Sequence, residues 1–207
     1  MGEKKKEKVS SGTIKMPNDS SKNKPMLREF SAGGVVYKRS LALRVKRAEE
    51  LKSRRVKILW LVTKSNPSKD YPKSVWRLPK GRLDDTSGGK HPGPYASGLR
   101  KAPEEIIQKA ALREVAEEGG VEALIVQKVI TDRYFFTLKG GQKILKFVTF
   151  YLMEWKSDIP SGFGPETSET IWLPYQEARR ILSYSDEKNI LDKAKEILDR
   201  GLQINLI

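Results

Sequence analysis

The chain holds 207 residues, enough to bury a sizeable core in one domain, and carries a formal net charge of +14. Its lack of cysteine excludes disulfides and thiolate metal ligands and suits a reducing compartment. No apolar run approaches the roughly 20 residues of a membrane span and no secretory signal opens the chain, so we expect a cytoplasmic protein that does not enter a membrane. The charge favours polyanionic ligands by attraction, although charge alone specifies neither a nucleotide nor RNA. It permits nucleic acid without favouring it, and nothing in the sequence predicts the oligomeric state.

The first segment, residues 1–27, is rich in lysine and poor in large apolar residues, which predicts a disordered basic tail ahead of a domain over residues 28–207. Runs rich in β-branched and aromatic residues predict the strands of that domain, which are residues 30–37, 56–62, 124–131, 134–138, 143–155 and 171–173. The highly charged residues 41–55 fit either a short helix or an extended hairpin loop. Residues 84–102, rich in Gly, Pro, Ser and Lys, predict an inserted loop.

Three helices are predicted by their boundary residues and apolar spacing. The first opens at Pro103, has acids in its first turn and ends at Gly119-Gly120. The second runs from Pro174 through Leu182, and the third covers residues 186–200 with apolar residues at helical spacing. Strands with a helix between them and helices at the end indicate an α/β sandwich.

The first predicted helix carries three carboxylates, Glu114, Glu117 and Glu118, at positions i, i+3 and i+4, which share one side of a helix. They crowd its last turn, where the helix dipole disfavours negative charge. Acids that follow a buried helix face need a cation, and oxygen ligands suit Mg²⁺, with Mn²⁺ as an alternative. A solvated acidic helix end is the competing interpretation.

This segment resembles the signature of the Nudix hydrolases, G-x5-E-x7-R-E-U-x-E-E-x-G-U, in which U is a bulky aliphatic residue. The matching positions are Glu105, Arg113, Glu114, Val115, Glu117, Glu118, Gly120 and Val121. Strict spacing places the signature glycine on Leu99, and Gly98 is one residue away. Gly81 is the better contextual match, because it ends a W-x-L-P-K-G segment that looks like the family's approach to the signature; residues 84–102 are then an insertion inside it. The resemblance covers roughly residues 30–200 and implies a Nudix-type α/β/α sandwich with a mixed sheet.

The resemblance also implies an activity, namely hydrolysis of a nucleoside diphosphate linked to another group, with water attacking a phosphorus. The implied metal ligands are Glu114, Glu117, Glu118 and the Gly81 carbonyl. Arg113 is expected to orient the carboxylates by pairing with Glu117 or Glu105. Glu105 is alternatively a helix N-terminal acid that acts only on the dipole, and Glu104 competes for its place in the signature.

The base that activates water is either a signature glutamate or an acid of the loop before Trp172, Glu166 or Glu169, although either loop acid is equally well explained as solvated. Arg77 and Lys80 are expected to contact phosphates. Weaker candidates for that contact are Arg82 and Lys146.

The aromatic residues and the single histidine carry less specific expectations. Tyr134 and Phe136 are candidates to stack on a base, but aromatics in strands more often belong to a core. We expect Trp60, Trp155 and Trp172 in the core, and His91 in solvent.

Within the family, three substrate classes remain open. No proline occurs between Val121 and Ile159, which argues against ADP-ribose enzymes. The glycine-rich first strand, the W-x-L-P-K-G segment, a tyrosine after the signature and the basic charge look most like enzymes acting on dinucleoside polyphosphates. Oxidised nucleoside triphosphates and RNA 5′ ends are the alternatives. An inactive Nudix-fold module that binds nucleotide or RNA is the alternative of another class, and its expected mark is substituted metal glutamates, which are intact here.

Overall fold

The structure is a computed structural model that describes residues 25–41, 56–68, 72–86, 91–138 and 141–204. The predicted tail, apart from residues 25–27, and the charged stretch 42–55 lie outside these residues. In the described part of the chain the strands and helices are β1 Leu27–Leu41, β2 Val56–Ser65, β3 Trp76–Arg77, β4 Lys80–Arg82, α1 Glu104–Gly119, β5 Val121–Thr137, β6 Lys143–Asp158, β7 Thr167–Pro174, α2 Tyr175–Ile181 and α3 Ser185–Ile204.

The strands form one mixed sheet, which has seven strands within the described residues. The main order is β3-β2-β1-β6-β5, with β4 pairing β1 and β7 pairing β2. Only β1 and β6 pair in parallel among the pairs formed by the described strands. No helix among these residues is long and apolar enough to cross a membrane.

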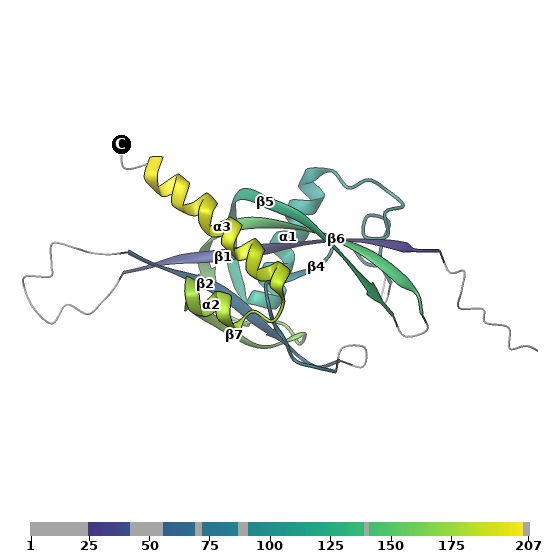
Figure 1. Cartoon of the computed structure of the whole chain (residues 1–207), viewed down its shortest axis with the longest axis horizontal. Coiled ribbons are helices and arrows are strands. Elements are labelled where there is room, and N and C mark those ends of the chain that lie inside the picture. Colours follow the sequence, from purple (N-terminus) through teal and green to yellow (C-terminus); the bar gives the residue numbers. More distant parts are fainter. Residues whose placement is uncertain (1–24, 42–55, 69–71, 87–90, 139–140, 205–207) are drawn as a thin grey trace, which may run out of the picture.

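Helices cover both faces of the sheet (Figure 1). Side chains alternate along a strand, so Val35 faces a core formed with α2 and α3, whereas its neighbour Val36 faces a core formed with α1. On the α1 side, a Cβ on Gly34 would overlap Val115 of α1, so this glycine permits close helix–sheet packing. The predicted α/β/α sandwich with a mixed sheet is confirmed.

The sequence predicts both ends of α1 correctly. It begins after Pro103, has Glu104 and Glu105 in its first turn, and ends before Gly120, whose φ of 68° is the left-handed cap that glycine adopts easily. The predicted gap between residues 131 and 134 is wrong, because β5 is one continuous strand. Asp132 and Arg133 continue the pairing with β6, opposite Val148 and Phe147.

The inserted loop packs on the sheet through its second half. The Asp84 carboxylate accepts hydrogen bonds from the N–H groups of Tyr95 (3.2 Å) and Ala96 (2.6 Å). The Ala96 carbonyl in turn accepts the N–H of Phe30 on β1 (2.8 Å). His91 is exposed, as expected.

The three tryptophans differ in burial. Trp60 is 2% exposed and belongs to the core, as predicted. Trp155 and Trp172 are only partly buried, and the Lys38 ammonium lies 4.2 Å from the centre of the Trp172 ring. The core prediction therefore holds fully for Trp60 alone among the three.

Candidate functional site

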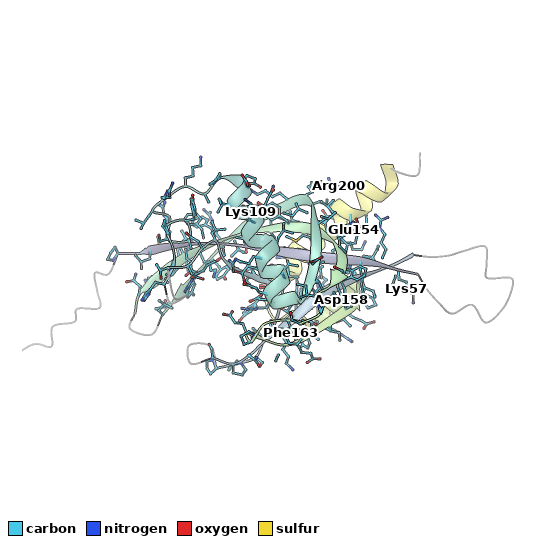
Figure 2. All side chains as sticks on the ribbon, turned by 180° about the vertical axis from the view of Figure 1, so that it is seen from behind. Lys57, Lys109, Glu154, Asp158, Phe163 and Arg200 are labelled. Atoms are coloured by element: carbon cyan, nitrogen blue, oxygen red, sulfur yellow. The ribbon has the colours of Figure 1, made fainter. Side chains whose placement is uncertain are left out.

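The site is built where α1 crosses β4. Glu114 and Glu118 of α1 are buried at 7% and 3% exposure, whereas the side chain of Glu117 is 57% exposed. The reverse view shows α1 in front of the sheet, with the loop that carries Phe163 near one end of the helix (Figure 2). That end is the C-terminal one, because the Glu117 carbonyl accepts the N–H of Gly164 (2.6 Å).

Gly81 is the glycine that lies against these acids. It pairs with Ala32 of β1, and a Cβ added to it would overlap the Glu114 carboxyl group. Gly98 instead has a φ of 74° and lies against the Phe30 ring. The geometry therefore favours Gly81 over Gly98 as the glycine of this site, although its spacing to Glu105 is the irregular one.

Arg113 connects α1 to β4. Its guanidinium contacts Glu114 (2.7 Å) and Glu117 (2.8 Å) and donates a hydrogen bond to the Arg82 carbonyl (2.7 Å). Glu105 lies elsewhere, since its exposed carboxylate pairs with Lys109 at 2.7 Å. Of the two predicted partners of Arg113, the structure brings Glu117 to it, and Glu105 occupies the position of a solvated helix N-terminal acid.

Glu104, the competitor of Glu105, lies apart from the acids of the last helix turns. Its carboxylate accepts a hydrogen bond from the Tyr151 hydroxyl (2.7 Å) and lies 3.8 Å from the Lys128 ammonium. It therefore ties the start of α1 to the sheet.

The two buried carboxylates carry raised pKa values. Burial raises the pKa of Glu114 to about 7, with Arg113 opposing and Glu118 and Glu117 adding to the rise. Burial also raises the pKa of Glu118, although it contacts the Arg77 guanidinium and accepts the Lys80 backbone N–H at 2.8 Å. Desolvated neighbouring carboxylates of this kind are stabilised by a bound cation.

The donor atoms suit a hard divalent cation, because carboxylate and carbonyl oxygens are the ligands such ions prefer. Glu114, Glu117, Glu118 and the Gly81 backbone supply them from two adjacent elements. No group of three acidic or histidine side chains is already gathered for a metal among the residues that the structure describes. The reason is visible in the ion pairs, since Arg77 contacts Glu118 and Arg113 contacts both Glu114 and Glu117.

The two loop acids have different surroundings. The negative charge of Glu166 contributes to the raised pKa of Glu118, which places Glu166 within electrostatic reach of the site. Glu169 instead lies opposite Lys64 in the β2–β7 pairing and forms an ion pair with it at 3.5 Å. Of the two loop acids, Glu166 is therefore the one whose charge acts on an α1 carboxylate.

The lysines expected to contact phosphates have internal partners. The Lys80 ammonium lies 2.5 Å from Glu187 and the Lys146 ammonium 2.6 Å from Glu29, with side-chain exposures of 10% and 16% for the two lysines. Burial lowers the pKa of Lys146, while the attraction of Glu29 opposes that effect. Tyr134 packs against the core beneath α2 and α3, which favours its core interpretation over base stacking.

Glu29 and Glu187 were not identified from the sequence. Both are buried at 5% exposure and far along the chain from the lysines they contact. The only sequence signal is an acid inside an apolar strand for Glu29, and Glu187 resembles any acid in a first helix turn.

Comparisons with known proteins agree on one family. A family profile described as NUDIX domain matches residues 51–194. The protein named MutT4 from Mycobacterium tuberculosis is 28% identical over 126 residues, which are 61% of this chain and 43% of that protein, so the chain spans less than half of that relative's length. A NUDIX hydrolase from Nitrosomonas europaea is 16% identical, with a TM-score of 0.49, over 82% of this chain and 89% of that one. An Ap4A hydrolase from C. elegans, solved as a binary complex, is 22% identical, with a TM-score of 0.46, over 83% of this chain and 98% of that one.

Proposed function

Because the chain belongs to the Nudix family, whose profile matches residues 51–194, we propose that it hydrolyses a pyrophosphate linkage in a nucleoside diphosphate derivative with Mg²⁺. The observation that carries this proposal is the meeting of the buried Glu114 and Glu118 carboxylates with the β4 backbone at Gly81. Both carboxyl groups have raised pKa values, and they lie beside arginines that match phosphate in charge and shape.

In the proposed mechanism Glu114, Glu117, Glu118 and the Gly81 carbonyl hold the metal. When bound, Mg²⁺ supplies neutralising charge at the phosphates and lowers the pKa of a water. Most of the acceleration then comes from positioning and electrostatics, as in other phosphoryl reactions.

In the same mechanism Arg77 and Arg113 bind the substrate phosphates. Arg77 and Arg113 now contact the carboxylates that the metal requires. With those carboxylates engaged by a cation, the two guanidinium groups would be free to donate paired hydrogen bonds to the substrate phosphates. Glu166, which the fold places near Glu118, is the proposed base for the attacking water.

The proposed substrate is a dinucleoside polyphosphate. The W-x-L-P-K-G segment, the glycine-rich first strand and the absence of proline between Val121 and Ile159 support this choice over ADP-ribose. Tyr134 packs against the core, so this proposal does not use it to stack on a base.

The test is product analysis with Mg²⁺ on diadenosine tetraphosphate, 8-oxo-dGTP, ADP-ribose and 5′-triphosphorylated RNA. We expect diadenosine tetraphosphate to be preferred, and Glu118→Gln to lose at least ~100-fold of activity with its fold intact. Glu122→Gln is the matched control, since the Glu122 carboxylate lies on the surface and accepts a hydrogen bond from the Ser157 hydroxyl (2.9 Å). Preference for another compound would overturn the substrate assignment. Inactivity on all four, with Mg²⁺ still bound, would favour the binding-module alternative.

A further inference from the structure

Strand β4 presents alternate residues to opposite faces of the sheet. Gly81 pairs with Ala32, while Lys80 and Arg82 pair with Gly33 and Ser31. Because successive side chains of a strand point to opposite faces, the Lys80 and Arg82 side chains lie on the face opposite the one where Gly81 meets Glu114. The backbone of β4 is thus held between two sets of contacts.

On the α1 face, the backbone around Gly81 contacts the acidic helix. The N–H of Lys80 donates to the Glu118 carboxylate (2.8 Å), and the Arg82 carbonyl accepts from Arg113 (2.7 Å). Gly81 itself lies directly against Glu114. A small shift of β4 therefore changes all three contacts together.

On the opposite face, a buried carboxylate from the C-terminal helix holds the same segment. Glu187, in the first turn of α3, contacts the Lys80 ammonium at 2.5 Å and accepts the backbone N–H of Leu78 at 2.8 Å. Two further hydrogen bonds join Ser183 to the backbone of Trp76, at 3.0 Å and 2.9 Å. The start of α3 and the turn before it therefore fix residues 76–80 at several points.

Glu29 holds the other end of β4 in the same way. Its carboxylate lies 3.4 Å from the Arg82 guanidinium and 2.6 Å from the Lys146 ammonium, and it is 5% exposed. Both cations of β4 are therefore anchored by acids from other elements, with Gly81 between them.

We propose that Glu187 is a positioning residue for the reaction. Through Lys80 and Leu78 it fixes the position of β4 relative to α1, so that the Lys80 N–H donates to the Glu118 carboxylate and the Gly81 backbone lies against Glu114. This inference rests on the proposed function. It also makes Lys80 an anchor of the backbone and not a ligand of the substrate. A buried ion pair is weak evidence for a gain in stability. The Lys80–Glu187 pair is therefore more informative about how β4 is held beside the site than about how stable the fold is.

The test compares Glu187→Gln with Asp192→Asn, a matched change on the same helix. Asp192 joins α3 to α2 instead of to β4, because its carboxylate accepts hydrogen bonds from Arg179 (2.9 Å) and Tyr175 (2.7 Å). We expect Glu187→Gln to raise the Mg²⁺ dissociation constant about 10-fold, the lower end of the loss seen when residues outside the ligand set that position a metal site are removed. Calorimetric Mg²⁺ titration without substrate measures this, and melting temperature reports the fold. Asp192→Asn should keep the Mg²⁺ affinity of the wild type even where its melting temperature falls equally.

A second set of variants separates anchoring from substrate binding. If Lys80 acts through Glu187, Lys80→Met and Glu187→Gln weaken Mg²⁺ binding to a similar extent, and the double variant is no worse than either one. If Lys80 contacts substrate directly, Lys80→Met raises KM, leaves Mg²⁺ affinity unchanged and adds to Glu187→Gln, which overturns the inference. Equal Mg²⁺ affinities for Glu187→Gln, Asp192→Asn and the wild type overturn it as well. These titrations need no turnover, so an inactive wild type would count against the proposed function alone.

Discussion

Replacing Gly81 with alanine tests the contact between β4 and α1 most directly. The added Cβ would lie less than 3.0 Å from all three atoms of the Glu114 carboxyl group, whereas ordinary contacts lie at 3.4–4 Å. Relief of this overlap displaces the carboxylate by on the order of 1 Å, a shift that costs about 100-fold in rate when it misplaces a catalytic group. Arg113 must move with it, because it contacts the same carboxylate at 2.7 Å. Because the overlapped atoms are the far end of a side chain that can move, we expect the free energy of unfolding to fall by no more than the ~1–3 kcal/mol typical of overpacking.

We therefore expect Gly81→Ala to remain folded, with kcat/KM lowered by about 100-fold and Mg²⁺ binding weakened. The measurements are steady-state kinetics on the preferred substrate, calorimetric Mg²⁺ titration and thermal unfolding. Gly201→Ala in α3 is the control, because a Cβ there meets nothing within 4 Å. That control should keep wild-type kinetics and stability, or gain the small increment typical of such a change. Wild-type turnover and Mg²⁺ affinity in Gly81→Ala would refute the reasoning, since the carboxylate would then tolerate the displacement.

Two further predictions concern acids of the site. Burial raises the pKa of Glu114 from 4.5 to about 7, so this carboxyl group contributes stability that is fully present below pH 4.5 and lost as the pH rises through about 7. The melting temperature of Glu114→Gln minus that of the wild type should therefore increase as the pH is raised from acidic to mildly alkaline values. Calorimetric scans that show the same difference at every pH would contradict this. Glu166→Gln should lower kcat by at least ~100-fold if Glu166 activates water, whereas Glu169→Gln, which loses only the pair with Lys64, should not; similar kinetics for the two variants would remove Glu166 from the mechanism.

The parts of the fold that the sequence predicted are those with local causes. Pro103, the acids of the first turn and Gly120 mark the ends of α1 within the segment itself, and each has its effect within a few residues. The continuity of β5 through Asp132 and Arg133 has no such local cause, because it depends on pairing with β6. Two polar residues in succession indicate a turn in a single sequence, and only the partner strand overrides that signal.

In the site, too, the features with local causes could be predicted from the sequence, and the contacts between distant residues could not. Spacing alone predicts Glu114, Glu117 and Glu118 on one buried side of the helix; this is correct for Glu114 and Glu118 but wrong for Glu117, whose side chain is 57% exposed. The partners of Lys80 and Lys146 could not be predicted from the sequence. Lys80 and Glu187, for example, are 107 positions apart and meet only because α3 packs back against the sheet. Gly81 and Gly98 were likewise left undecided by spacing, and the pairing of β4 with β1 distinguishes them.

The charges around Gly81 show how a protein with a net charge of +14 could hold a metal and a polyanion at one place. The cations of the site contact carboxylates of the same chain, in the pairs Arg77–Glu118, Lys80–Glu187, Arg82–Glu29, Arg113–Glu114 and Lys146–Glu29. Glu114 and Glu118 of α1 are among the proposed metal ligands, whereas Glu29 and Glu187 lie on the opposite face of β4. In the proposed mechanism a bound metal would free two arginines and leave the anchors of β4 paired. Because free guanidinium groups are well satisfied by phosphate, we expect metal and substrate each to favour the binding of the other, with a coupling that is equal in both directions.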